Sequence, residues 1–365
     1  MATYPLIPIK SLFRKQEFNY ALEGGNLRRM VKEVGPEYPN VDFPEPYDLQ
    51  HPKLPAKLRE KGISLVTKRV LTMDLCSGKS ITKLGKEFLA QLAESKGMTP
   101  DELQADMKAK MEDPVEFEKM MNSVPSENQM IMIRQFLKTR DLIRNGFALG
   151  FNYTFGFLGA TIPYEWCKIP PNGFALLKDL YDIHGHQIFE IGAFNADPHA
   201  GNVMLDEDTG RLGLIDYGQL IEITHEERRT LARMFVAADE GDIETLAAGY
   251  TALGMRLEDK RHPEMGINPP GLCNTIFSAH FGGKQGLKRS LKYFDCASIA
   301  DMQANMDKMM HFEGMNPTYM MVQRCSFCLQ GVGGGVGIPG INAIPLLKPS
   351  AQKYLEGHGE EGTAS

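Results

Sequence analysis

The 365-residue sequence predicts an α+β protein that is mostly helical and has a few short strands. Three observations predict this class. Residues 81–143 are rich in Met, Lys and Glu and read as helix, interrupted by three prolines. Residues 202–205 and 211–215 are short apolar runs joined by an acidic turn ending in glycine, which is typical of a β-hairpin. Thr224 and Glu227 form a capping box, which predicts a helix over residues 226–240.

The first 80 residues predict one helix followed by two strands. Spaced apolar residues among charges predict a helix over residues 11–34, with Ser11 as its cap. Four prolines between 36 and 46 then exclude helix. Residues 63–67 and 70–75 have strand-like composition, and Ser77-Gly78 ends the second strand.

An uncharged, glycine-containing stretch covers residues 145–164. Its polar residues and Pro163 argue against a membrane span, so we interpret it as a packed or interfacial segment. We expect its aromatic residues to be buried against the helical body, and an apolar surface near lipid is the alternative. The Gly- and Glu-rich C-terminus, from about residue 350 to 365, predicts a disordered tail.

Composition excludes several classes of function. A net charge of −6 and a pI near 5.9 argue against nucleic-acid binding. Six scattered cysteines predict a reducing compartment rather than a disulfide framework.

Cys325 and Cys328 lack the second pair that a structural zinc site needs, so we interpret them as small buried residues on a helix. His184 and His186 lie in an apolar, helix-like stretch and predict no metal site. No signal or transit peptide is visible at Met1.

The residues around the predicted hairpin predict phosphoryl-transfer chemistry. Such chemistry needs oxygen ligands for Mg²⁺ and a carboxylate that orients the attacking oxygen. Kinase folds supply them from Asp-x-x-x-x-Asn and from the Asp of a D-F-G turn one hairpin later. Asp197 and Asn202 have this spacing, and Asp216-Tyr217-Gly218 follows the hairpin. We therefore predict Asp197 as the catalytic residue and Asn202 and Asp216 as metal ligands, brought together by the hairpin.

The stretch Phe194-Asn195-Ala196-Asp197-Pro198-His199-Ala200-Gly201-Asn202 resembles the F-H-A-D-P-H-P-G-N catalytic loop of the UbiB/ADCK (aarF-domain) atypical kinases. Asn195 replaces the usual His and Ala200 the usual second Pro. We expect neither departure to touch a metal ligand. The resemblance covers residues 15–350 and implies a protein-kinase-like fold with a mostly helical C-lobe.

Two upstream segments extend the resemblance to the residues that would bind the cofactor. Residues 17–26 are similar to the family's E-x-D-Y-x-x-E-A-x-N helix, in which Glu23 matches the αC glutamate and Asn19 replaces an acid. Residues 70–74 resemble the hinge strand V-L-T-M-E, so that Met73 and Asp74 would meet the adenine of ATP. The resemblance thus implies a partial N-lobe over 1–78, a C-lobe over 79–349 with a helical insert at about 85–170, and a tail over 350–365.

The family implies Mg²⁺ and ATP as cofactors and support of isoprenoid-quinone (ubiquinone or plastoquinone) lipid metabolism in mitochondria or chloroplasts. Its implied partners are ATP or ADP, the quinone lipid or its biosynthetic complex, and a peripheral membrane contact, without nucleic acid. Only residues 219–223 separate Gly218 from the Thr224 cap, which is too short for a peptide-binding activation segment and favours a small-molecule kinase or ATPase.

A second hypothesis is a non-catalytic interaction protein. The family's K-x-G-Q helix, alanine-rich loop and phosphate-binding lysine precede the helix of Glu23, and the sequence as given contains none of them in its first sixteen residues. From these residues alone we expect weak MgATP binding, because each lost charge-assisted hydrogen bond removes roughly 1.5–3 kcal/mol.

Overall fold

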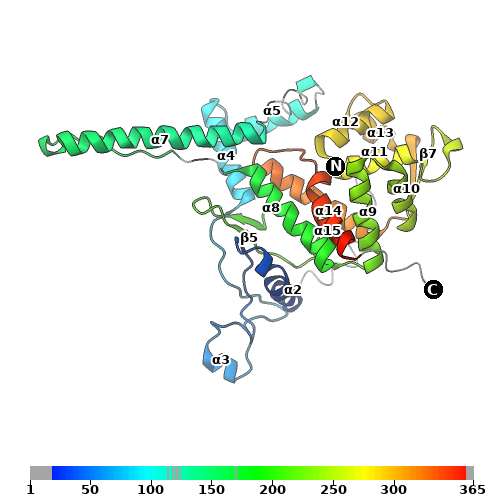
Figure 1. Ribbon diagram of the computed structural model, residues 1–365, viewed down its shortest axis with the longest axis horizontal. Helices are drawn as coiled ribbons and strands as arrows, with labels where there is room; N and C mark the ends of the chain where they lie inside the picture. Colours follow the sequence, from blue (N-terminus) through cyan, green and yellow to red (C-terminus); the bar gives the residue numbers. More distant parts are fainter. Residues whose placement is uncertain are drawn as a thin grey trace.

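A computed structural model describes residues 19–112, 115–116, 119, 123, 125–167, 169 and 171–358. Most of this chain is helical, and the strands are short (Figure 1), so the predicted α+β class is confirmed. The α-helices are α2 (Tyr20–Glu33), α3 (Ala56–Glu60), α4 (Ile81–Ser95), α5 (Pro100–Glu112), α7 (Glu127–Phe155), α8 (Gly173–Gly185), α9 (His225–Glu240), α10 (Ile243–Ala252), α11 (Pro270–Phe281), α12 (Gly283–Phe294), α13 (Ile299–Met309), α14 (Pro317–Gly335) and α15 (Ile344–Gly357).

The core of the helical body is formed by α8, α9, α11, α14 and α15. Phe235 on α9 is fully buried and meets Phe277 and Phe281 of α11 edge to face, with centroid distances of 5.1 and 4.9 Å. Such contacts stabilise by roughly 0.5–1.5 kcal/mol beyond the area they bury. The core therefore supplies a rigid base for the strands that lie against it.

The strands form three small sheets: β1 (Val41–Asp42), β5 (Leu212–Leu214), β4 (Val203–Leu205) and β2 (Lys79–Ser80) in that order, then β3 (Ala193–Asn195) with β6 (Leu220–Glu222), and β7 (Arg256–Asp259) with β8 (Met310–Glu313). The predicted hairpin is confirmed, because β4 and β5 pair antiparallel with Val203 opposite Leu214. Gly78 has a φ of +86°, and a Cβ there would lie 2.3 Å from the carbonyl oxygen of Leu205. Only glycine therefore lets the chain enter β2 so close to the hairpin.

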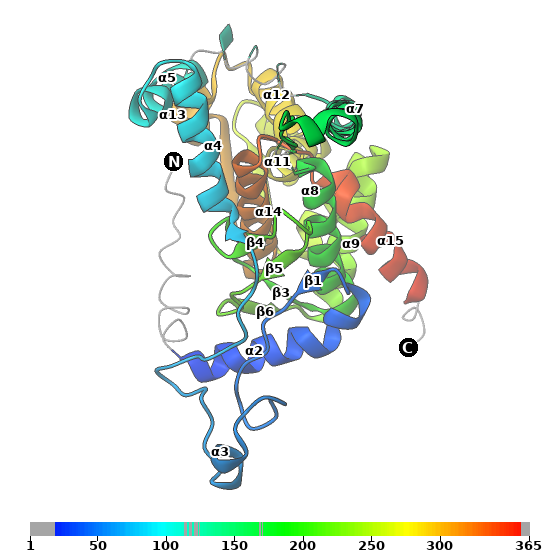
Figure 2. The same cartoon turned by 90° about the vertical axis from the view of Figure 1, so that its left-hand side faces the viewer.

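Two predicted helices are present with small changes in their bounds. The capping box of α9 is confirmed: Thr224 Oγ1 accepts from the Glu227 amide and Glu227 Oε2 accepts from the Thr224 amide, both at 3.3 Å. The N-terminal helix is described from Tyr20, and its predicted cap Ser11 lies outside the described residues. Figure 2 shows α2 crossing beside the strands, with the loop that carries α3 beyond it.

Two predictions about local structure are wrong. Residues 63–67 and 70–75 form no regular strand, because their backbones meet residues 45–47 only through scattered bonds such as Tyr47 N to Thr72 O, at 2.8 Å. A strand needs a continuous ladder, and apolar composition alone does not provide one. The tail predicted from residue 350 is helical up to Gly357 in α15, where Ala351 and Tyr354 are fully buried. Residues 359–365 lie outside the described residues.

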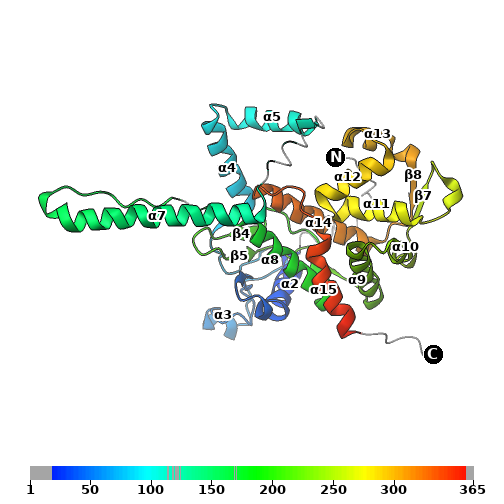
Figure 3. The same ribbon diagram turned by 45° about the horizontal axis from the view of Figure 1, so that its top comes forward.

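The helix α7 and the segment 156–167 form an arm that projects from the body (Figures 1 and 3). Residues 162–167 run back along the helix and are held by its side chains. Asn152 pairs with both main-chain groups of Ile162, at 2.9 and 2.7 Å, and Asn145 does the same with Glu165, at 3.0 Å each. The separation of seven positions from Asn145 to Asn152 corresponds to a rise of about 10.5 Å along the helix, and the three positions from Ile162 to Glu165 span about 10 Å of extended chain. The spacing of the two asparagines along α7 therefore matches the spacing of their partners on the returning segment.

The arm corrects the expectation that residues 145–164 are buried against the body. The side chains of Phe147, Tyr153 and Phe157 are 68%, 91% and 81% exposed. The polar residues Asp141 and Asn145 are the buried ones, because they face the returning segment. None of the helices in the described ranges is both long enough and apolar enough to cross a membrane.

Candidate active site

The residues Asn202 and Asp216 meet at the open end of the β4–β5 hairpin. Asn202 directly precedes β4 and Asp216 follows β5, and the Ile215 amide donates to the Asn202 carbonyl at 3.2 Å. This pairing places Asn202 Nδ2 2.8 Å from Asp216 Oδ2. The hairpin thus brings the two side chains together as the sequence predicted. Their role as metal ligands stays a prediction.

The turn after β5 is held by the protein backbone. Asp216 Oδ1 accepts from the Gly218 amide at 2.8 Å, and a Cβ on Gly218 would lie 3.2 Å from that oxygen. Tyr217 is fully buried, and its hydroxyl accepts from Gln187 Nε2 at 2.9 Å. Asn26 of α2 donates to the Tyr217 carbonyl at 2.8 Å. The turn is therefore tied both to the helical body and to α2.

Asn195 joins this turn to the catalytic loop. Its side chain accepts from the Asp197 amide at 2.9 Å and donates to the Asp216 carbonyl at 2.7 Å. Asn195 is buried at the end of β3. This departure from the family loop therefore contacts the main chain of Asp216, a predicted metal ligand, which was not expected from the sequence. A carboxamide can accept and donate at once, which this bridge requires.

Glu23 on α2 points at the same turn. The position of a Cβ on Gly218 would be 3.7 Å from Glu23 Oε2. Burial and the negative charge of Asp216 raise the pKa of Glu23 to about 7. No cation pairs with Glu23 within the part of the chain that the structure describes. Glu23 and Asp216 thus form an acidic pair that a cation would stabilise.

The donor set fits one Mg²⁺ ion. Mg²⁺ is usually held by one or two carboxylates together with substrate phosphates and water. Asp216 supplies a carboxylate and Asn202 a carboxamide oxygen, provided that the Asn202 amide rotates, because its nitrogen now faces Asp216. Among the described residues, no three His, Cys, Asp or Glu side chains form a metal cage, and a site completed by phosphates needs none.

The side chain of Asp197 is held by residues of α14, and the sequence did not predict this contact. Arg324 Nη2 lies 2.7 Å from Asp197 Oδ2, and Arg324 Nη1 donates to Gln219 Oε1 at 2.7 Å. The Cys328 thiol lies 3.4 Å from Asp197 Oδ1. Arg324 is the only charged residue of α14, and a lone cation in an apolar helix was the available signal. Charge-assisted contacts of this kind orient the carboxylate.

The two cysteines of α14 differ from each other. Cys325 is buried, as predicted, whereas Cys328 is half-buried and borders the catalytic loop. Burial and the charge of Asp197 raise the pKa of Cys328 to about 12. The thiol therefore stays protonated and serves as a weak donor to Asp197. His184 is also a core residue, whose Nδ1 lies 2.7 Å from the Leu180 carbonyl.

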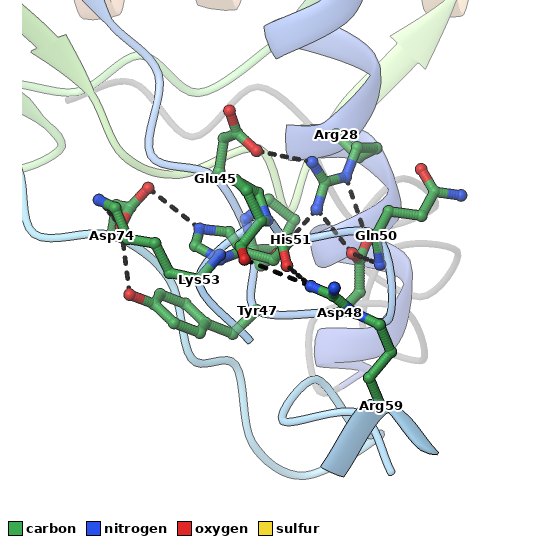
Figure 4. Close-up of polar contacts among 11 residues, drawn as sticks. Arg28, Glu45, Tyr47, Asp48, Gln50, His51, Lys53, Arg59 and Asp74 are labelled. Atoms are coloured by element: carbon green, nitrogen blue, oxygen red, sulfur yellow. Dashed lines mark hydrogen bonds and ion pairs between the residues drawn. The ribbon is translucent and has the colours of Figure 1, made fainter. Parts of the chain in front are cut away.

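Of the predicted hinge residues Met73 and Asp74, Asp74 lies in a separate polar cluster (Figure 4). Met73 makes an isolated bridge with Pro46. Asp74 meets His51 Nε2 at 3.2 Å, Tyr47 Oη at 3.4 Å and Lys53 Nζ at 3.5 Å. Burial raises the pKa of Asp74, but the hydrogen bond with His51 and the charge of Lys53 outweigh it and hold the pKa below its usual value.

A cavity of about 520 Å³ lies beside this segment, lined among others by Val31, Phe43 and Asp74. Its lining does not include Asp197, Asn202 or Asp216. The structure therefore brings Glu23, Asn202 and Asp216 together and ties Asp197 to them through Asn195. No hydrogen bond or ion pair of the described residues joins Asp74 directly to that group.

Comparison with known proteins matches residues 171–249 to the ABC1 atypical kinase-like domain. An uncharacterized protein of Synechocystis is 26% identical over 169 residues, covering 46% of this chain and 27% of its own length. The chloroplastic protein ACTIVITY OF BC1 COMPLEX KINASE 1 of Arabidopsis thaliana is 32% identical over 73 residues, or 20% of this chain and 11% of that protein. Probable protein kinase UbiB of Xanthomonas campestris is 21% identical over 174 residues, or 46% and 29%.

The matched region thus spans less than a third of the length of these relatives. Among solved structures, Rv3197 of Mycobacterium tuberculosis, in complex with erythromycin, is 12% identical, with a TM-score of 0.44 over 97% of this chain and 63% of that one.

Proposed function

Because the chain belongs to the UbiB/ADCK family of ABC1 atypical kinase-like proteins, as its catalytic loop predicted, we propose that it is a Mg²⁺- and ATP-dependent atypical kinase or ATPase. The observation that carries the proposal is the 2.8 Å contact between Asn202 and Asp216 at the hairpin end, with Glu23 facing the same turn. Two oxygen-bearing side chains there, in excess negative charge, suit a divalent cation and nucleotide phosphates.

Each residue then has a distinct role. Asn202 and Asp216 hold Mg²⁺, which would neutralise charge on the phosphates. Asp197 accepts the proton of the attacking hydroxyl or water and is oriented by Arg324 and Asn195. Glu23 forms an ion pair with the positively charged side chain that contacts the phosphates. Met73 offers its main chain and Asp74 its carbonyl to the adenine, because the Asp74 amide already donates to the Glu45 carbonyl at 3.0 Å.

We further propose a small acceptor rather than a protein. In protein kinases the segment after the D-F-G turn holds the peptide substrate. Here that position is taken by β6, which pairs with β3 directly after Gly218 and is followed at once by α9. Support of isoprenoid-quinone lipid metabolism in a chloroplast or mitochondrion follows from the family. The name of the Arabidopsis relative, which is chloroplastic, favours the chloroplast.

A non-catalytic scaffold is the second candidate. The observation that favours it is the absence of any cation beside Glu23 in the described ranges. Two neighbouring carboxylates without a cation can stay close together if one of them holds a proton. The raised pKa of Glu23 indicates that Glu23 holds it. Nucleotide binding separates the two candidates.

The test is a thermal-shift titration with MgADP on the wild type, Asp216→Asn and the matched control Asp208→Asn. Asp208 lies in the exposed turn of the same hairpin. At about a hundred times its dissociation constant the ligand should stabilise the wild type and the control by about 2.7 kcal/mol, and Asp216→Asn by nothing measurable. A full shift in Asp216→Asn would refute the metal assignment. No wild-type shift at millimolar MgADP would favour the scaffold.

A further inference from the structure

The outer part of the arm is uncharged and apolar. Residues 145–164 contain no Asp, Glu, Lys or Arg. This segment, here called the arm tip, exposes apolar side chains from the helix and from the returning segment, namely Phe147, Leu149, Tyr153, Phe155, Phe157, Leu158 and Tyr164. Exposed apolar patches of such extent on soluble proteins mark interaction surfaces.

The apolar side chains point to opposite sides of the helix. Leu149 and Tyr153 are four residues apart and share one face. Phe147 and Phe151 share another, about 200° around the axis, and Phe151 packs on Phe155 with a centroid distance of 5.1 Å. The remaining face is covered by the returning segment. A flat protein surface would cover one of these faces, whereas a helix that is apolar all round suits a medium that surrounds it.

Positively charged residues lie on the arm between the tip and the helical body. Residues 128–167 contain four basic and two acidic residues, in a chain whose net charge is −6. Both acids are already paired, Asp141 with Arg140 and Glu165 with Arg144. Lys138 is exposed and has no partner among the described residues. The basic residues on this part of α7, here called the collar, are complementary to anionic lipid headgroups. They are Arg134, Lys138, Arg140 and Arg144.

Aromatic residues lie at the boundary between tip and collar. Tyr164 and Trp166, on the returning segment, are 50% and 65% exposed. Tyr and Trp prefer the headgroup level of a bilayer, where the ring is partly buried and the polar end is hydrated. The tip without charged residues, these two aromatic residues and the basic collar therefore follow one another along the arm in the order of bilayer core, interface and headgroups. The collar half of α7 also exposes apolar side chains such as Ile131, Met132 and Phe136.

We propose that the arm tip inserts into one leaflet of an anionic phospholipid bilayer. The collar then contacts the headgroups, and the helical body stays outside. The occupant is a lipid bilayer rather than a second copy of the chain, because the apolar side chains face several directions and the net charge beside them is positive.

The sequence provides its own probe, since Trp166 is its single tryptophan. The full chain is mixed with vesicles of phosphatidylcholine, with or without phosphatidylglycerol, and with versions whose acyl chains carry bromine. Anionic vesicles should shift the Trp166 emission to the blue, and brominated lipid should quench it. No shift with anionic vesicles would overturn the proposal. A blue shift that depends on protein concentration and is not quenched by bromine would assign the tip to self-association and would also overturn it.

Variants locate the contact. Phe155→Ser/Phe157→Ser should lower the vesicle partition coefficient at least about tenfold, because two apolar rings leave the lipid. Phe88→Ser, on the exposed face of α4, is the matched control and should bind as wild type. Lys138→Gln should weaken binding to anionic vesicles roughly fivefold, and Lys57→Gln on α3 should not. Equal binding of the double variant and the wild type would refute the location. Because Phe157 lies outside α7, Phe157→Ser serves as the variant if the double one does not fold.

Discussion

The two halves of the candidate site are held in different ways. The half around Asp197, Asn202 and Asp216 rests on paired strands over a buried core, and every side chain has a short contact that crosses between elements. The half around Met73 and Asp74 rests on irregular chain tied by surface ion pairs, such as Arg28 with Asp48 at 2.6 Å. This pair is partly exposed, and ion pairs that water reaches contribute roughly 0–1 kcal/mol. We infer that the first half is rigid in isolation and that the second is the part open to adjustment.

The largest expected effect compares two phenylalanines, one in each half. Phe194 in β3 is fully buried, whereas Phe43 is partly buried and lies 6.2 Å from the Tyr217 ring. Phe194→Ala should lower the free energy of unfolding by about 3–5 kcal/mol, and Phe43→Ala by less than about 2 kcal/mol. Urea denaturation measures both. Equal losses would show that the two halves share one core.

A smaller effect concerns two tyrosine hydroxyls. Tyr217→Phe leaves the buried Gln187 amide without its acceptor and should cost about 1–3 kcal/mol of unfolding free energy. Tyr47→Phe in the other half removes only a long contact with Asp74, at 3.4 Å, and should cost less than about 0.5 kcal/mol. The same denaturation experiment compares them. A Tyr217→Phe variant as stable as wild type would mean that Gln187 finds another partner.

The smallest effect is a pH dependence with opposite signs in the two halves. The folded state raises the pKa of Glu23 from its ordinary value of 4.5 to about 7, so folding is favoured at low pH, and this stability is lost as pH rises from about 4.5 to about 7. Glu23→Gln does not titrate. It should therefore gain stability relative to wild type across that window, by about 1 kcal/mol after discounting for solvent screening.

Asp74→Asn is the control for this prediction. The lowered pKa of Asp74 means that its contribution is present above its unfolded value and is lost as pH falls. The variant should be slightly less stable than wild type at neutral pH, and the difference should vanish in acid. Melting curves from pH 4 to 8 test both variants. A Glu23→Gln difference that does not change with pH would contradict the burial of a charged pair at the turn.

The parts of the site that the sequence predicted are those with local signals. Asn202, Asp216 and the hairpin between them lie within fifteen residues, and the turn and strand patterns determine their pairing. Arg324 and Cys328 were missed because 127 and 131 residues separate them from Asp197, and only the packing of α14 brings them there. The strands expected near residues 63–75 failed for a related reason: composition indicates a strand, but its partner must come from elsewhere in the fold.

The arm has a consequence for how its length can change. The asparagines of α7 grip main-chain atoms of the returning segment, so substitutions at Ile162 or Glu165 alter the surface of the arm without altering the grip. Insertions are different, because one added residue on either side moves every later pair out of register. Only coupled changes, about two helical turns on one side with three residues on the other, preserve the match. The side chains at the gripped positions can therefore vary freely, whereas the length of the arm can change only in discrete steps.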